Sequence, residues 1–386
     1  MLANCDSDGI WRDIAHMTDS RGGQKNWGEH THQEIFQQPS LWEDTFRRVQ
    51  QVNWGLPGNG TGILSGAGSS AFAAAAIQIA SAKCRAVPST DLLLDPRPLE
   101  NASFLMSVAR SGDSPECDAV VQLCAEQYPS VPQFAITCNS EGRLARDPSI
   151  KVLLLDSRTN DQSLVMTSSF SNITLAGLCI QDANRLRADL PMVCEHVDRA
   201  LEDFDKIAYE IAQVLPARAM ILASAPLFPC AQEGALKVLE MTAGKVAVVC
   251  ETFLGVRHGP MSFLQEDTLV VCLLSSDPYC RRYEMDLVNE LRAKGLGRLV
   301  AIGASAPEEG AFAWKVPAAA PNLPDYLRTA FEIVFIQLLA YHLSLRAGLN
   351  PDSPSPEGII QRVVNGVRIY ERTMVGATPP TTTLPE

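Results

Sequence analysis

Short apolar runs, polar turns and longer helical patterns follow one another repeatedly along the chain, which predicts strands followed by helices. The apolar residues 62–65 lead into the turn Gly66-Ala67-Gly68, and an alanine-rich run to Lys83 follows, which is typical of a strand, a tight turn and a helix. A second apolar run ends in a polar turn, after which Pro115 stands at the first-turn position that proline favours in helices. The strands expected in this half cover residues 62–65, 104–109, 133–138 and 151–155.

The second half of the chain repeats this order after a charged helical stretch at 182–214. Its Ser276-Asp277-Pro278 turn corresponds to Ser111-Gly112-Asp113 of the first half, which indicates an internal duplication. The glycine turn is replaced by Ser224-Ala225-Pro226, and proline withdraws a backbone donor, so we expect the second copy to lack an anion-binding turn. The elements expected here are strands at 218–224, 268–275 and 299–303 and helices at 231–242 and 279–294.

Strands and helices that alternate at these lengths predict an α/β fold of two lobes, each a parallel, five-stranded-like sheet flanked by helices. A chain of 386 residues suits two lobes, because single domains cluster at about 100–150 residues. The apolar helix at 326–346 carries Arg328, Glu332 and His342, which a membrane span rarely tolerates, so we expect a buried helix. The expected segments are an N-terminal arm without sustained periodicity at 1–45, lobe 1 at 46–200, lobe 2 at 201–350 and a C-terminal tail at 351–386.

The composition narrows the kinds of partner and the compartment. A net charge of −12 argues against nucleic-acid binding, which needs clustered Lys and Arg. The 11 cysteines are odd in number and include no Cys-x-x-Cys pair, so reduced, buried thiols are expected rather than disulfides. The acidic, polar start carries no apolar stretch behind basic residues, so no secretory signal is expected. We expect a cytoplasmic protein whose partner is a small molecule or a protein, with no nucleic acid and no membrane.

Two turns rich in glycine and serine form the first candidate site. Both follow predicted strands, and at this edge of a parallel sheet helix N-termini offer free N–H groups to an anion. Each turn alone is more often an ordinary turn with capping serines, but the two together favour an anion site. Neither Gly-x-Gly-x-x-Gly nor Gly-Lys-Ser/Thr occurs here, so a phosphomonoester fits better than a nucleotide. The residues concerned are Gly66, Gly68, Ser69 and Ser70 in the first turn and Arg110, Ser111, Gly112 and Ser114 in the second.

A second candidate site consists of Glu233, Lys237 and Glu240, whose spacing places them along one face of a helix. An exposed, salt-bridged face is the alternative. The compact apolar residues around them favour partial burial of Glu240, which would raise its pKa and suit it as a base. His258 lies between Gly255 and Pro260, and histidine is suited to proton transfer near neutral pH, although a lone histidine is more often a surface or core residue.

These motifs closely resemble sugar isomerase (SIS) domains, and above all the group of galactosamine-6-phosphate deaminase/isomerases, also described as tagatose-6-phosphate ketose/aldose isomerases. The resemblance spans roughly residues 30–370 and implies an SIS-type α/β fold for both lobes. The segments that carry it are Ser65-Gly66-Ala67-Gly68-Ser69-Ser70, Ala109-Arg110-Ser111-Gly112-Asp113-Ser114-Pro115-Glu116, Ala235-Leu236-Lys237-Val238-Leu239-Glu240 and Arg257-His258-Gly259-Pro260.

The resemblance also implies roles for single residues. Glu240 matches the glutamate that moves the proton, and Lys237 matches the lysine one turn before it. His258 matches the ring-opening histidine, which the family supplies across a subunit interface, so a homodimer or larger assembly is implied. The sugar phosphate is implied to bind at Gly68, Ser69, Ser70, Arg110, Ser111 and Ser114, with Thr167, Ser168, Glu233 and Arg362 as further candidates.

The expected reaction is conversion of D-galactosamine 6-phosphate into D-tagatose 6-phosphate and ammonia, with no metal and no organic cofactor. Deamination of glucosamine 6-phosphate and aldose–ketose isomerisation of a hexose phosphate remain open, because the sequence does not distinguish epimers at C4. A sugar-phosphate-sensing regulator is the non-enzyme alternative. The lack of a basic helix-turn-helix segment and the presence of Glu240 with His258 favour the enzyme.

Overall fold

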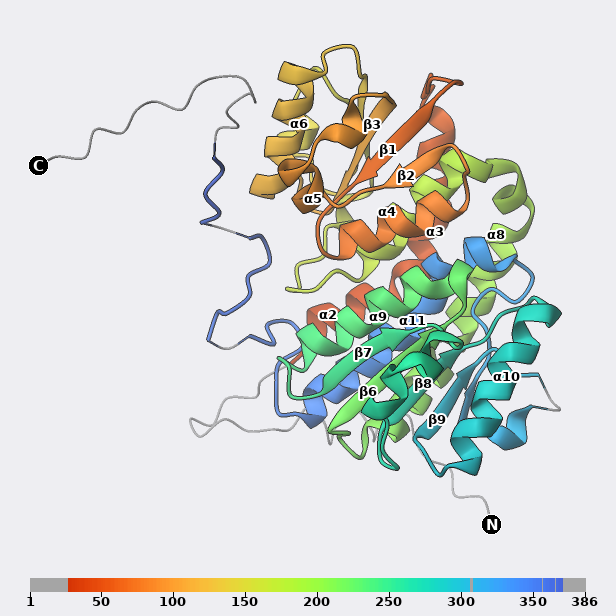
Figure 1. Ribbon diagram of the computed structural model, residues 1–386. Coiled ribbons are helices and arrows are strands. Elements are labelled where there is room, and N and C mark those ends of the chain that lie inside the picture. The colour runs from red at the N-terminus through yellow and green to blue at the C-terminus, as the bar shows by residue number, and fades with distance from the viewer. Residues whose placement is uncertain (1–26, 306–307, 356, 365, 371–386) are drawn as a thin grey trace, which may run out of the picture.

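The computed structural model describes residues 27–305, 308–355, 357–364 and 366–370. Two parallel sheets of five strands, each flanked by helices, form two lobes stacked one above the other (Figure 1). The predicted two-lobed α/β fold is therefore confirmed. The strands of lobe 1 are β1 (Thr61–Ser65), β2 (Cys84–Ala86), β3 (Ala102–Ala109), β4 (Gln133–Thr137) and β5 (Lys151–Leu154). The strands of lobe 2 are β6 (Arg218–Ala223), β7 (Ala247–Glu251), β8 (Leu269–Leu273), β9 (Arg298–Ile302) and β10 (Trp314–Val316).

The two sheets have the same topology. Lobe 1 has the strand order β2-β1-β3-β4-β5, and lobe 2 has β7-β6-β8-β9-β10 when read from the corresponding edge. In each lobe the first strand in sequence therefore lies between the second and the third, which supports the internal duplication. In such doubly wound sheets the order of strands reverses beside the first strand, and ligands bind at the carboxyl ends of the strands there.

The helices cover both sheets, and three of them, α4, α9 and α11, lie between the lobes (Figure 1). The α-helices are α2 (Glu29–Phe36), α3 (Gln38–Gln51), α4 (Ser69–Ile79), α5 (Ser89–Leu94), α6 (Pro115–Gln127), α7 (Arg143–Arg146), α8 (Ser168–Ala212), α9 (Phe228–Met241), α10 (Pro278–Ala293) and α11 (Asp325–Arg346). The short 3-10 segments are η1 (Arg97–Leu99), η2 (Ser157–Thr159), η3 (Ala225–Leu227), η4 (Gly255–His258), η5 (Pro260–Phe263) and η6 (Glu309–Ala311).

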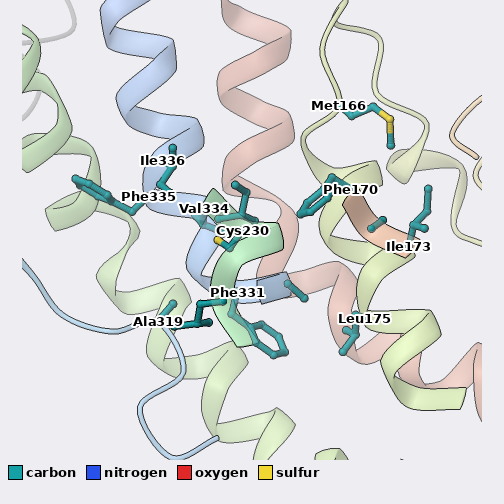
Figure 2. Close-up of a cluster of buried hydrophobic side chains, with 14 of the residues drawn as sticks. Met166, Phe170, Ile173, Leu175, Cys230, Ala319, Phe331, Val334, Phe335 and Ile336 are labelled. Atoms are coloured by element: carbon teal, nitrogen blue, oxygen red, sulfur yellow. The ribbon is translucent and has the colours of Figure 1, made fainter. Parts of the chain in front are cut away.

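Helix α11 forms the centre of the core, as the sequence predicts for residues 326–346. Figure 2 shows Phe331 and Phe335 of α11 in one apolar cluster with Cys230 of α9 and Phe170 of α8. Its charged residues are neutralised inside the fold, because the Arg328 guanidinium pairs with carboxylates of its own helix. No helix in the described part of the chain is long and apolar enough to cross a membrane.

The N-terminal arm differs from the prediction where the structure describes it. From Glu29 to Gln51 the chain forms helices α2 and α3, and α3 packs against α8. The Trp42 indole donates to Ser171 Oγ at 3.1 Å, and the Thr45 hydroxyl donates to Asn172 Oδ1 at 2.6 Å. Helix α3 has no clear apolar period in the sequence, because several of its buried positions are polar and bind partners in α8. Residues 1–26 lie outside the described residues.

The charged stretch at 182–214 forms most of the long helix α8, which is interrupted by a non-helical backbone at Asp182. The described part of the C-terminal tail, up to residue 370, leaves the end of α11 and returns towards lobe 1 without helix or strand (Figure 1). The ten cysteines within the described ranges are all free thiols, and eight of them are buried, as expected.

Candidate active site

A cavity of about 330 Å³ lies at the carboxyl ends of β1 and β3, between lobe 1, the helix α9 and the returning tail. Both predicted anion-binding turns and one member of the predicted acid–base face contribute to its wall. The polar and charged residues that line it are Ser69, Ser70, Thr90, Arg110, Ser111, Ser114, Glu116, Glu240, Gln361 and Arg362. The sheet topology explains this meeting, because the carboxyl ends of adjacent parallel strands share one edge.

The first turn brings Ser70 to the cavity. Gly68 has a positive φ of 57° and precedes α4, whose first residues Ser69 and Ser70 are buried. Gly66 allows a close approach, because a Cβ atom there would lie 2.7 Å from Ser70 Cβ. The Ser70 hydroxyl contacts Met166 Sδ at 3.8 Å. A thioether is a weak acceptor, so the Ser70 hydroxyl is available to a stronger one such as a phosphate oxygen.

The second turn brings Ser111 and Ser114 to the same cavity. Gly112 has a positive φ of 69°, and the Ser111 hydroxyl accepts a hydrogen bond from the Asp113 N–H at 3.3 Å. The Ser114 hydroxyl donates to Glu116 Oε2 at 3.0 Å. Helix α6 begins at the next residue, so its free N–H groups point toward this end of the cavity.

Arg110 is buried at the end of β3 and holds the surrounding loops. Its Nη1 atom donates to the carbonyl oxygens of Leu164 and Val165, both at 3.1 Å, and its Nη2 atom donates to the Arg362 carbonyl oxygen at 2.6 Å. Burial lowers the pKa of this guanidinium. No carboxylate of the described residues lies within ion-pair distance of it, so its positive charge acts on the cavity.

Arg362 fastens the tail over the cavity from the other direction. Its Nε atom donates to the Asp161 carbonyl oxygen at 2.8 Å, and its Nη2 atom donates to Asn160 Oδ1 at 2.7 Å. Together with the hydrogen bond from Arg110 to the Arg362 carbonyl oxygen, these bonds hold the tail against lobe 1. Residues 360–364 consequently form one wall of the cavity.

The predicted face of α9 is an ion cluster between the lobes. Lys237 Nζ lies 2.6 Å from Glu240 Oε2 and 3.2 Å from Glu233 Oε1, and it donates to Ser69 Oγ of lobe 1 at 3.1 Å. Glu233 and Lys237 are fully buried, whereas the Glu240 side chain is 24% exposed and lines the cavity. The alternative of an exposed salt-bridged face is therefore wrong.

The electrostatics of this cluster follow from burial. Burial raises the pKa of Glu233 to about 7, an effect that Lys237 opposes and the charge of Glu240 strengthens. Burial alone would lower the pKa of Lys237, but the two carboxylates raise it above its ordinary value. Lys237 therefore stays protonated, and its ammonium group lies directly beside the Glu240 carboxyl group.

Besides the fully buried Glu233 and Lys237, three further predicted site residues do not line this cavity. His258 is exposed at the end of η4, on the segment that follows the edge strand β7. Thr167 and Ser168 are fully buried at the start of α8, where their N–H groups donate to the Asp161 carboxylate at 2.8 and 3.1 Å. This is the geometry of a helix N-terminus held by a neighbouring carboxylate, so their backbone N–H groups serve the fold.

Several lining residues had no place in the sequence prediction. Glu116 directly follows the serine turn and Pro115, and this position in the sequence could have indicated that it lies at the cavity. Thr90 lies in the short helix α5 and Met166 in the connection before α8, where no periodic pattern marks the direction of their side chains. The tail residues around Arg362 reach the cavity only because the chain returns to lobe 1 after α11.

Known proteins share this architecture. A Streptomyces coelicolor protein provisionally named D-galactosamine-6-phosphate deaminase AgaS is 38% identical over 367 residues, which cover 88% of this chain and 95% of that protein. The D-galactosamine-6-phosphate deaminase AgaS of Escherichia coli is 33% identical over 377 residues, covering 89% of this chain and 96% of that protein. No family model matches the chain.

Two solved structures extend the comparison. The tagatose-6-phosphate ketose/aldose isomerase of Escherichia coli superposes with a TM-score of 0.79 at 30% identity, covering 89% of this chain and 97% of that one. A Clostridium novyi protein provisionally given the same name superposes with a TM-score of 0.82 at 31% identity, covering 91% and 100%.

The two duplicated parallel sheets are the fold of the SIS-type phosphosugar isomerases, so the chain has the architecture of this class. Within the class, the identity over most of both chains decides the family. The chain belongs to the family of D-galactosamine-6-phosphate deaminases AgaS, which confirms the resemblance found in its motifs.

Proposed function

We propose that this protein is an enzyme that converts D-galactosamine 6-phosphate into D-tagatose 6-phosphate and ammonia. The observation that carries the proposal is that Glu240 and the serines of both predicted phosphate turns line one cavity. Its volume of about 330 Å³ lies in the range of small-ligand sites. The names of the relatives, deaminases and ketose/aldose isomerases, support this reaction.

The substrate phosphate binds at the end of the cavity formed by the two turns. Hydroxyl groups of Ser70, Ser111 and Ser114 and the N–H groups at the starts of α4 and α6 supply hydrogen-bond donors to its oxygens. Arg110 supplies a buried positive charge. Binding replaces the weak contact of Ser70 with Met166 by a charge-assisted one.

The chemistry runs on the open-chain aldehyde, because the carbonyl at C1 makes the hydrogen at C2 acidic. The Glu240 carboxylate takes the proton from C2 and returns it to C1 by way of an enolamine. Because the C1 oxygen gains a proton and the amino nitrogen loses one, the product is an imine at C2 with a hydroxyl at C1. Water then hydrolyses the imine to the ketose and ammonia. Lys237 holds the Glu240 side chain in position for the first step, and Glu233 in turn holds Lys237 in place.

His258 opens the sugar ring in a neighbouring subunit, and the enzyme is at least a homodimer. This assignment accounts for the exposed position of His258 outside the cavity of its own chain. The cytoplasm is the proposed location, because buried free thiols suit a reducing compartment.

The proposal is tested by measuring ammonia released from galactosamine 6-phosphate and, separately, from glucosamine 6-phosphate. We expect ammonia from the first alone and a loss of about 10²–10⁴-fold in Glu240→Gln, as for removal of a general base. Full turnover by Glu240→Gln would reject this base. Ketose formation from an unaminated hexose phosphate without ammonia would favour a plain isomerase, and tight binding without turnover would favour a sensor.

Mixing two inactive variants tests the shared site. When Glu240→Gln and His258→Asn chains are unfolded and refolded together, each mixed dimer contains one intact site, so about a quarter of the sites regain activity. Recovery no greater than that of each variant refolded alone would place both residues in one subunit.

A further inference from the structure

We propose that lobe 2 retains the second anion-binding turn of the duplicated fold and that its own Asp325 carboxylate fills this turn. The ligand class of the turn is a small carboxylate or another small oxyanion. The sequence prediction was that lobe 2 lacks an anion turn altogether. This inference concerns the lobe opposite the proposed catalytic cavity and does not depend on the proposed function.

The topology makes the turn after β8 the counterpart of the turn after β3. Each of these strands is the third of its lobe in sequence and pairs with the first strand on one side and the fourth on the other. Ser111 is the second residue after β3, and Ser275 is the second residue after β8. In lobe 1 this turn faces the cavity, whereas in lobe 2 it faces a carboxylate.

The donors around Asp325 form an anion site. The Ser275 hydroxyl donates to one carboxylate oxygen, and the Ser276 N–H and hydroxyl donate to the other at 2.9 and 2.8 Å. Arg328 Nη1 donates to the latter oxygen at 2.7 Å. Ser275 and Arg328 are 1% and 2% exposed, so both are built into the interior. Burial acts to raise the pKa of Asp325, but these donors lower it below its ordinary value.

Asp325 is not an ordinary helix cap. It is the first residue of α11, yet the hydroxyl and N–H groups that it binds belong to a turn about 50 residues earlier in the chain. The neighbouring turn of lobe 2 is filled in the same way. The buried Glu284 carboxylate accepts hydrogen bonds from Ser224 Oγ, directly after β6, and from the Ser275 N–H at 2.8 Å.

Removing the Asp325 side chain should leave these donors free for a carboxylate from solution. In Asp325→Ala, the thermal midpoint falls by several degrees, because a buried guanidinium and two serines lose a partner. Formate, the smallest carboxylate, should then restore at least half of this loss in a saturable way. Asp325→Gly leaves more room and should respond to lower formate concentrations.

Asp325→Asn is the matched control, because its amide keeps the space filled and leaves no room for formate. Wild type and Asp325→Asn report any formate binding elsewhere, including lobe 1, and that shift is subtracted. Each formate titration is paired with chloride at the same ionic strength. Should Asp325→Ala not accumulate as a folded protein, the yield on refolding in formate against chloride gives the same comparison.

A saturable stabilisation by formate in the alanine and glycine variants but not in the controls supports the filled anion turn. Equal formate effects in all four proteins overturn it, as does a refolding yield that is the same in formate and in chloride. In either of those cases Asp325 only joins α11 to the sheet. None of these outcomes depends on turnover, so they leave the proposed function untouched.

Discussion

Replacing Glu233 by glutamine removes a carboxylate that the fold buries completely while keeping its shape. Glu233 lies on α9, 3.2 Å from Lys237 Nζ, and no part of its side chain is exposed. Burial raises its pKa from 4.5 to about 7, with Lys237 lowering and Glu240 raising it. Lys237 keeps its second partner, Glu240, at 2.6 Å, so the substitution does not leave it alone in the interior.

The size and sign of the effect follow from proton linkage. Between pH 4.5 and 7 the folded protein binds a proton at Glu233 that the unfolded chain does not bind, so the free energy of unfolding falls as pH rises through this window. A difference of about 2.5 pKa units corresponds to at most about 3 kcal/mol, which is fully lost above pH 7. Glu233→Gln has no such group, and its stability should fall less with pH.

Urea unfolding followed by tryptophan fluorescence at pH 5 and pH 8 measures this. Relative to wild type, Glu233→Gln should gain about 2–3 kcal/mol between the two pH values, with the urea m-value unchanged. Glu290→Gln is the control, because Lys294 and Arg257 lower the pKa of Glu290 below 4.5, so its contribution is complete above that pH and this variant should parallel wild type between pH 5 and pH 8. Parallel pH dependences for wild type and Glu233→Gln would show that Glu233 titrates normally and would refute the burial argument.

Two further predictions concern the tail and the thiols. Arg362→Ala removes the hydrogen-bond donors that hold the tail against lobe 1. In steady-state kinetics it should raise KM for the sugar phosphate about tenfold, which corresponds to a loss of about 1.4 kcal/mol of binding free energy. Arg368→Ala, in an exposed part of the same tail, should leave KM unchanged. Burial raises the pKa of Cys117 to about 12, so this thiol should resist maleimide at pH 8 until the protein unfolds. The half-buried Cys280 should react before it. Rapid labelling of Cys117 in the native protein, detected by peptide mapping, would contradict this prediction.

The sequence predicts the central strands and the edge strand β5, but it misses the other three edge strands. Strands β3 and β8 are buried along most of their length and form continuous apolar runs, which is the strongest signal that a parallel sheet gives. Strands β2 and β10 have three residues each, and β7 is half-exposed at the edge of its sheet. Such short or mixed segments carry no clear period, so they were not predicted.

The candidate site was predictable to the extent that it depends on strand ends and helix faces. Ser70 and Ser111 follow neighbouring parallel strands, and Lys237 and Glu240 share one face of a helix, so local rules bring each set together. Contributions from the tail, such as Arg362, depend on where an irregular segment returns, and no local pattern encodes that path. The role proposed for His258 requires a neighbouring subunit, whose placement the order of elements in one chain does not determine.

The duplication explains why one lobe can stay open while the other supplies the reactive helix. An empty anion turn leaves buried donors without partners, and each such donor costs about 1–3 kcal/mol. Lobe 2 avoids this cost by placing Asp325 and Glu284 on its turns, which fixes α11 against the sheet. Because α9 packs on α11 and its Lys237 donates to Ser69 of lobe 1, filling the second site holds Glu240 at the mouth of the first. A ligand in lobe 2 would have to displace the Asp325 carboxylate and so loosen α11. Lobe 1 therefore binds the ligand, and lobe 2 positions Glu240.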